Sequence, residues 1–162
     1  MTQQDIKPHT SIVDKFKDLW IYYFLQSSLA GIALLIIVLA LGKDRMVAVS
    51  AMGATAFIVF AMPNNISAKT RNVIGGHLVG LLSGTIFYFA PLSYFIEYPL
   101  VVGIAVFFMV ALDFEHAPAA GTALAVVIND VYPLDVFIAV MAGAAILSLS
   151  RYFLRNHLKD LV

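Results

Sequence analysis

The chain has 162 residues, of which 61% are hydrophobic and 12% are charged, and its mean hydropathy is +0.90. A soluble domain of this size could not bury so much apolar surface, so the composition indicates an all-α integral membrane protein. The formal net charge is zero and cysteine is absent. These two facts exclude nucleic-acid binding through bulk charge, disulfides and thiolate metal sites.

Residues 1–19 form a charged stretch before the first apolar run. Lysines and aspartates are mixed there, unlike the basic and then hydrophobic layout of a cleaved signal. The apolar spacing in residues 11–19 predicts a short amphipathic helix at the membrane interface, followed by Trp20 at the headgroup level. We expect residues 1–19 to be cytoplasmic or interfacial, residues 20–155 to form a single transmembrane domain, and residues 156–162 to be a cytoplasmic tail.

Six apolar segments follow in chain order. They lie at residues 20–42, 46–62, 72–95, 99–113, 117–129 and 134–154. Segments 1, 3 and 6 reach the roughly 20 residues that a helix needs to cross the hydrocarbon core, whereas segments 2, 4 and 5 are shorter. Turn formers or charges mark the breaks at residues 42–45, residues 63–65, Pro99, residues 113–118 and residues 129–133.

The loop charges favour one topology. If all six segments cross, eight basic residues lie on the side of both termini, and only Lys43 and Arg45 lie opposite. The eight are Lys7, Lys15, Lys17, Lys69, Arg71, Arg151, Arg155 and Lys159. The positive-inside rule therefore predicts six crossings with both termini cytoplasmic, as in a bacterial inner membrane. The alternative has four spans and two re-entrant segments, which changes the split to six against four.

The chain also contains an internal echo. Gly31-Ile32-Ala33 recurs as Gly103-Ile104-Ala105, and Gly53-Ala54-Thr55-Ala56 recurs as Ala120-Gly121-Thr122-Ala123. The two halves, about 20–95 and 99–155, would each hold three spans. Three is an odd number, so the halves would have opposite orientations, which is the inverted-repeat plan of many secondary transporters.

The short segments 2 and 5 are the first candidate site. Gly53 and Thr55 in segment 2, and Pro118, Gly121 and Thr122 in segment 5, combine helix-weakening or helix-starting residues with a hydroxyl. A helix that begins within the membrane offers free N–H groups and the positive end of its dipole to an anion. The alternative is that small residues let helices pack closely and that each threonine bonds to its own helix.

Arg71, Asn72 and His77 begin segment 3 and form the second candidate site. His77 lies six residues beyond Arg71, roughly 9 Å deeper at helical rise. An ionisable residue within the membrane indicates function by default, because it is costly in lipid. The alternatives are a histidine bonded to a neighbouring helix and an arginine bound to lipid phosphate.

Glycines recur at every fourth residue of segment 3. Gly76, Gly80 and Gly84 would give one face of this helix a small-residue packing ridge. Its partner would be segment 6, where Ala139 and Gly143 occupy the corresponding positions, or another subunit.

Asp113, Glu115 and His116 precede segment 5. Two carboxylates beside a histidine could relay protons for a symporter, or they could form a solvated loop. Zinc-type spacing, phosphate loops and nucleophile motifs are absent from the sequence. We therefore expect no enzymatic activity, no catalytic residue, no metal and no cofactor.

These motifs resemble those of the HPP family of small bacterial and plastid membrane proteins, named for a His-Pro-Pro motif. The matching stretches are Ala51–Ala56, Pro63, Arg71–His77 and His116–Leu124, of which the Arg71–His77 run is the most specific. The naming motif reads His-Ala-Pro here, with Ala117 in place of the first proline. The resemblance implies a small membrane protein, usually described with four spans, and some members are linked to nitrite transport. Such a role would suit an anion site at a helix terminus, with Arg71, His77 and His116 near its cytoplasmic mouth.

The sequence therefore predicts a transporter or channel for a small inorganic anion, with nitrite implied by the resemblance. The anion would lie between segments 2 and 5. Two alternatives remain: a non-transporting packing or partner-binding protein, and a proton-coupled carrier that uses Asp113, Glu115 and His116. The expected partners are the anion, membrane lipid and further copies of the chain, because so small a bundle leaves little protein to enclose a pore.

Overall fold

The computed structural model describes residues 12–41, 46–90, 92–128 and 133–162, and this part of the chain is all-helical. The elements are α1 (Ile12–Leu41), α2 (Met46–Ala61), the 3-10 turn η1 (Ile66–Ala68), α3 (Thr70–Tyr88), α4 (Tyr94–Ala111), α5 (Pro118–Ile128) and α6 (Pro133–Leu154). The predicted breaks at residues 63–65 and 113–118 are present. Residues 1–11, and the breaks at residues 42–45 and 129–132, lie outside the described residues.

Three of the described helices are long and apolar enough to cross a membrane: Val13–Leu39 in α1, Tyr94–Ala111 in α4 and Leu134–Leu154 in α6. The expected break at Pro99 is wrong, because α4 begins at Tyr94 and continues through the proline to reach 18 residues. The proline lies in the second turn, where its missing N–H removes a single backbone hydrogen bond. Segment 4 is therefore longer than the sequence predicted.

Segments 2 and 5 are short, as predicted, and both form continuous helices. α2 has 16 residues and α5 has 11, which correspond to roughly 24 Å and roughly 16 Å of helix. Gly53 lies inside α2 without interrupting it, whereas Pro118 is the first residue of α5 and suits that position.

The first helix is longer than expected. α1 runs without a break for 30 residues from Ile12, so the predicted interfacial helix and the first span are one element. Its first turns expose the apolar side chains of Val13, Phe16 and Trp20, each by more than half. Such exposed apolar surface is what a lipid environment accommodates.

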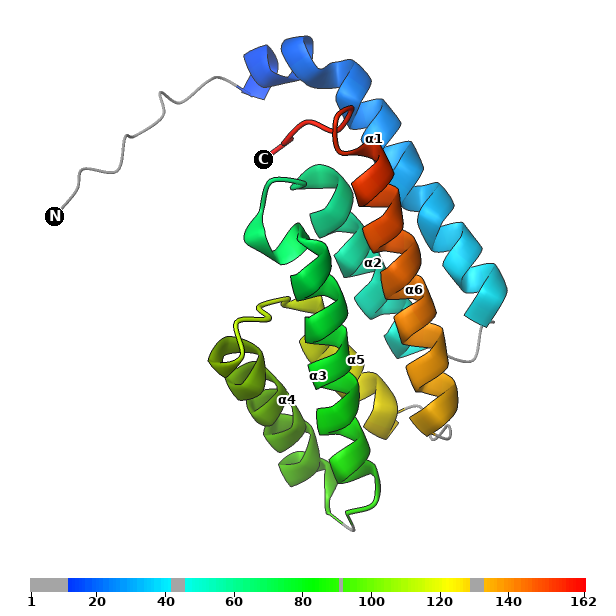
Figure 1. Cartoon of the computed structure of the whole chain (residues 1–162), viewed down its shortest axis with the longest axis vertical. Coiled ribbons are helices and arrows are strands. Elements are labelled where there is room, and N and C mark those ends of the chain that lie inside the picture. The colour runs from blue at the N-terminus through cyan, green and yellow to red at the C-terminus, as the bar shows by residue number, and fades with distance from the viewer. Residues whose placement is uncertain (1–11, 42–45, 91, 129–132) are drawn as a thin grey trace, which may run out of the picture.

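Successive helices run in alternating directions (Figure 1). α1 and α4, the first helices of the two expected halves, are therefore opposed, as an inverted repeat requires. The twofold relation between the halves remains a prediction. Both ends of the described chain lie at one end of the bundle, because the Lys159 ammonium lies 4.5 Å from the centre of the Tyr22 ring.

α3 is central and packs against α4, α5 and α6 (Figure 1). The glycine ridge does not meet α6 as expected, but lies against α5 and the loop before it. A methyl group on Gly80 would come 2.3 Å from the Ala119 carbonyl oxygen, and one on Gly84 would come 2.5 Å from the Ala123 carbonyl oxygen. The sequence could not identify this partner, since small residues mark close approach without indicating which helix approaches.

The matching positions of α6 have other neighbours. Gly143 lies against Met52 of α2 and Ile37 of α1, and Ala139 is buried. Gly143 therefore packs α6 onto the first two helices, and α6 also contacts α3.

Candidate functional site

A cluster of buried polar side chains lies where α2, α3 and α5 meet. His77 of α3, His116 of the loop between α4 and α5, Thr55 of α2 and Thr122 of α5 are each at most 1% exposed. We call these four residues the His–Thr cluster. Buried polar groups in an apolar bundle must be hydrogen-bonded, and all four are.

His77 is held from both sides by the two threonines that the internal echo paired. Its Nε2 lies 2.9 Å from Thr55 Oγ1, and its Nδ1 lies 2.8 Å from Thr122 Oγ1. The short helices α2 and α5 thus contact the same imidazole ring through one threonine each. The structure brings together three of the predicted site residues at this point.

His116 completes the cluster from outside the helices. Its Nε2 lies 3.0 Å from Thr55 Oγ1, and its Nδ1 donates to the Ser67 carbonyl at 2.8 Å. The rings of His77 and His116 meet edge to face with centroids 4.9 Å apart. Burial lowers the pKa of His116 to about 4, although its hydrogen bond to the Ser67 carbonyl acts in the opposite direction. The His116 ring is therefore neutral at neutral pH.

The Arg71–His77 run attaches the 112–116 loop to α3. The Arg71 guanidinium is paired with the Asp113 carboxylate at 2.7 Å and lies 5.0 Å from the centre of the Phe114 ring. The Asn72 amide donates to the Glu115 carbonyl at 3.3 Å. Arg71 and Asp113 are both more than half exposed, so neither belongs to the His–Thr cluster.

The two adjacent glycines of this run make room for the same loop. A methyl group on Gly75 would come 2.5 Å from a Phe114 ring carbon, and one on Gly76 would come 2.6 Å from the His116 Cβ. Side chains at either position would push the loop away from α3. The motif therefore positions His116 beside His77.

The loop turns sharply as α4 ends. Asp113 has a φ of 60°, in the left-handed region that favours glycine. Its N–H donates to the Val110 carbonyl, and the Phe114 N–H donates to the Met109 carbonyl, which together form a Schellman cap. Aspartate tolerates this conformation better than most residues. Its carboxylate is also the partner of the Arg71 guanidinium, which explains why an aspartate rather than a glycine suits this position.

The predicted anion site at the start of α5 is largely filled by the protein itself. The Ala119 N–H donates to the His116 carbonyl at 2.9 Å, and the Ala120 N–H donates to the Ala117 carbonyl at 3.2 Å. Gly53 and Gly121 are half-buried and make only ordinary contacts, with Leu34 and Ala51. The polar atoms of this region are therefore those of the His–Thr cluster.

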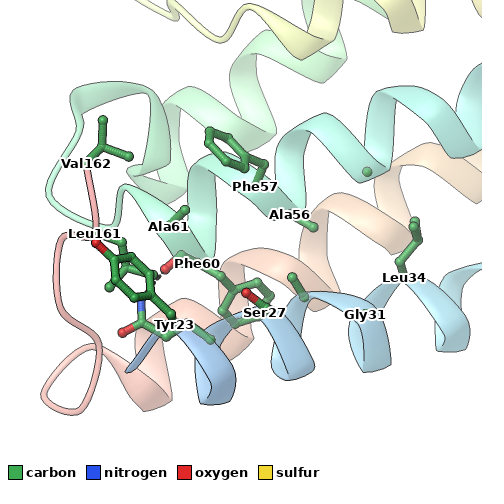
Figure 2. A pocket seen from close by; sticks show the side chains of 13 residues that line it. Tyr23, Ser27, Gly31, Leu34, Ala56, Phe57, Phe60, Ala61, Leu161 and Val162 are labelled. Carbon is green, nitrogen blue, oxygen red and sulfur yellow. Dashed lines mark hydrogen bonds between the residues drawn. The ribbon is translucent and has the colours of Figure 1, made fainter. Parts of the chain in front are cut away.

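A cavity of about 400 Å³ lies elsewhere, between α1 and α2 (Figure 2). Tyr23 and Leu161 lie near one end of it and Leu34 near the other. Its lining is mostly apolar and contains no lysine, arginine, histidine or acidic side chain. Since nothing in it would compensate a buried charge, this cavity does not suit a small anion.

Gln26 is one of the residues that line this cavity, and the sequence did not identify it as a site residue. Its side-chain amide donates to the carbonyls of Phe60 and Lys159 and accepts from the Lys159 N–H at 2.9 Å. The Leu161 N–H also donates to the Ala61 carbonyl at 2.9 Å. The expected tail 156–162 is thus fastened to α1 and α2. An amide within a long apolar run was the signal that could have identified Gln26.

Within the described residues, no group of three or more His, Cys, Asp or Glu side chains is arranged to hold a metal ion. The Glu115 Oε2 is buried and has no hydrogen-bond partner among these residues.

Comparisons with known proteins agree with the motifs. The family model described as "HPP, transmembrane region" matches residues 16–160, which is nearly the whole chain. Searches of curated proteins and of solved structures gave no match.

Proposed function

The chain belongs to the HPP transmembrane family, and from that premise we propose that it carries a small inorganic anion across the membrane, with nitrite as the first candidate. The observation that supports this proposal is the His–Thr cluster. Its four buried polar side chains meet at one point of an apolar bundle, and N–H and O–H groups are the natural ligands of an anion.

The internal echo supports the placement of the anion. Thr55 and Thr122 reach the same ring from α2 and α5, one from each expected half. In our proposal the halves form an inverted repeat and the anion lies between their short helices, as in other transporters of that plan. The imidazole and hydroxyl groups already bond one another, so the anion would replace one of these bonds as it enters.

The first alternative, a packing or partner-binding protein, relied on the glycine ridge. That ridge is covered by α5 and the 112–116 loop of the same chain, so it offers no surface to a partner. An oligomer remains part of our proposal, with its interface on another face of the bundle.

The second alternative, proton relay through Asp113, Glu115 and His116, is not favoured in that form. Asp113 is paired with Arg71 at the surface, and only His116 of the three reaches the His–Thr cluster. We also propose that both termini are cytoplasmic and that the membrane is a bacterial inner membrane, because of the predicted distribution of basic residues.

Flux into proteoliposomes tests the proposal. Purified protein should move nitrite, nitrate or halide faster than empty liposomes do. His77→Ala and Thr122→Val should each reduce this flux about tenfold or more, because each removes a partner of the proposed site.

Thr85→Val is the matched control, since the Thr85 hydroxyl bonds only to the Leu81 carbonyl of its own helix. It should leave the flux unchanged. Absence of flux for all three kinds of anion would contradict the proposed function. Flux in both His77→Ala and Thr122→Val that equals the wild-type flux would contradict the proposed site.

A further inference from the structure

The hydrogens of the His–Thr cluster can be assigned from one fixed point. A carbonyl oxygen only accepts, so His116 Nδ1 must carry a hydrogen for the Ser67 carbonyl. In a neutral ring the Nε2 is then bare and accepts the Thr55 hydroxyl hydrogen. With that hydrogen engaged, the Thr55 oxygen accepts from His77 Nε2–H. The bare His77 Nδ1 then accepts from Thr122.

The neutral assignment leaves one short contact without a hydrogen. Thr55 Oγ1 also lies 3.0 Å from the Ala51 carbonyl, but its single hydrogen already points to His116. A hydroxyl has one hydrogen and two lone pairs, and Thr55 has three partners. In the neutral cluster two of these partners, the Ala51 carbonyl and the bare His116 Nε2, are acceptors. The single Thr55 hydrogen can reach only one of them, so one of the two contacts always lacks a hydrogen.

One additional proton completes the set. With a hydrogen on His116 Nε2, both imidazole rings donate to the two lone pairs of Thr55 Oγ1. The Thr55 hydroxyl is then free to donate to the Ala51 carbonyl. Every contact of the cluster now has its hydrogen. A second proton would place two cations 4.9 Å apart between centroids in an apolar interior, so the capacity is one.

On the described elements that pack around the cluster, the other cationic side chains are bonded elsewhere or exposed. The described parts of α2 and α5 contain no titratable side chain, and α4 contributes only Glu97, Tyr94 and Tyr98. Arg71 is paired with Asp113 at the surface, and Arg151 of α6 donates to the Pro63 carbonyl. The other titratable side chains of these elements are Lys69, which is exposed beside η1, Tyr88 at the end of α3, Asp135 and Tyr152 on α6, and Glu115 next to His116.

We propose that the His–Thr cluster binds one proton together with each anion, so that the protein catalyses electroneutral anion–proton symport. This rests on the proposed function. The anion and the proton enter as separate ions and leave as separate ions, and no bond other than that of the proton to an imidazole nitrogen forms or breaks. Each ion compensates the charge of the other in the apolar interior.

The test measures anion and proton movement together. Proteoliposomes with an entrapped pH indicator receive a nitrite or nitrate pulse at several membrane voltages, set by potassium gradients and valinomycin. We expect one proton to enter with each anion and the rate to be independent of voltage. Nitrate is included because nitrous acid itself crosses lipid, and empty liposomes measure that background.

Variants locate the proton. Thr55→Val should reduce coupled flux about tenfold or more, because both rings lose their shared partner. Thr55→Ser, which keeps the hydroxyl, should restore it, and Thr85→Val should match the wild type. If Thr55→Val does not fold, His116→Gln replaces it, and the coupled flux should be lost in the same way.

A second measurement needs no transport. In lipid bilayers at neutral pH, nitrogen NMR of labelled histidines should show His116 protonated at Nδ1 and His77 at Nε2. Nitrite should then produce one imidazolium signal, which is absent in His116→Gln.

The outcomes separate the two proposals. Anion flux that follows voltage and carries no proton would overturn symport while leaving anion transport intact. Proton coupling that survives in His116→Gln and disappears in Glu115→Gln would also overturn the assignment. Absence of any anion flux would overturn the proposed function, and symport with it.

Discussion

Two interfaces of the bundle use glycine in opposite ways. Between α3 and α5, Gly80 and Gly84 let one helix touch the backbone of the other, and a methyl group would collide with a carbonyl oxygen. Between α1 and α2, Gly31 has nothing within 4 Å of its missing side chain and lines the cavity of Figure 2. The first interface is tight beside the His–Thr cluster, and the second leaves space. A glycine in a membrane helix thus allows close helix contact at one interface and lines a cavity at the other.

The largest change in the free energy of unfolding is expected for a substitution that disrupts the tight interface between α3 and α5. Gly80→Ala should reduce the free energy of unfolding by about 3 kcal/mol, because the new methyl group cannot fit against the Ala119 carbonyl. Gly31→Ala is the matched control and should raise it by about 0.5–1 kcal/mol through helix propensity. Reversible denaturation in mixed micelles, followed by circular dichroism, measures both. Equal effects of the two changes would show that the interfaces do not differ.

A smaller effect on the free energy of unfolding is expected at Gln26, which lines the cavity between α1 and α2. Gln26→Leu should cost about 1–2 kcal/mol, because the Lys159 N–H and two backbone carbonyls lose a hydrogen-bond partner. Hydrogen exchange of the Lys159 amide should become faster. The amides of α3 should keep their protection, and a loss there as well would contradict a local role for Gln26.

The smallest effect is expected at the surface of the tight region. The pair of Arg71 and Asp113 is more than half exposed on both sides, so its coupling energy should be about 0.5 kcal/mol and should fall with salt. A double-mutant cycle with Arg71→Ala and Asp113→Asn measures this energy, since asparagine tolerates the left-handed backbone at this position. A coupling above about 2 kcal/mol would indicate a buried, functional pair instead.

Much of the fold could be predicted from composition and turn signals. The six segments, the short second and fifth helices, and the break after α2 follow from apolar runs and from Pro63 with its neighbours. The continuation of α4 through Pro99 could not be predicted, because a proline is tolerated near the start of a helix and the sequence did not show that α4 begins as early as Tyr94. The helix that packs against Gly76, Gly80 and Gly84 could not be predicted either, since the spacing of the glycines defines one face of α3 but not which helix lies against it.

The candidate site was predicted by residue type and not by geometry. The echo singled out Thr55 and Thr122, and membrane burial singled out His77, yet nothing in the sequence indicates that both threonines bond one ring. Arg71 and Asn72 begin the segment that carries His77, and for that reason the sequence placed them in the candidate site. In the structure these two side chains bond the loop that carries His116. The sequence does not show such a contact, because the loop lies about forty residues further along the chain.

The central helix is also poorly suited to enter a membrane alone. α3 is not among the described helices that are long and apolar enough to cross, because its glycines, Asn72 and His77 lower its hydropathy. Such a segment is poorly recognised by the insertion machinery until partners cover its polar groups. Those partners, the 112–116 loop and α5, are synthesised later. During biogenesis α3 should therefore wait in a protected, partly inserted state, and its final placement should follow the completion of α5.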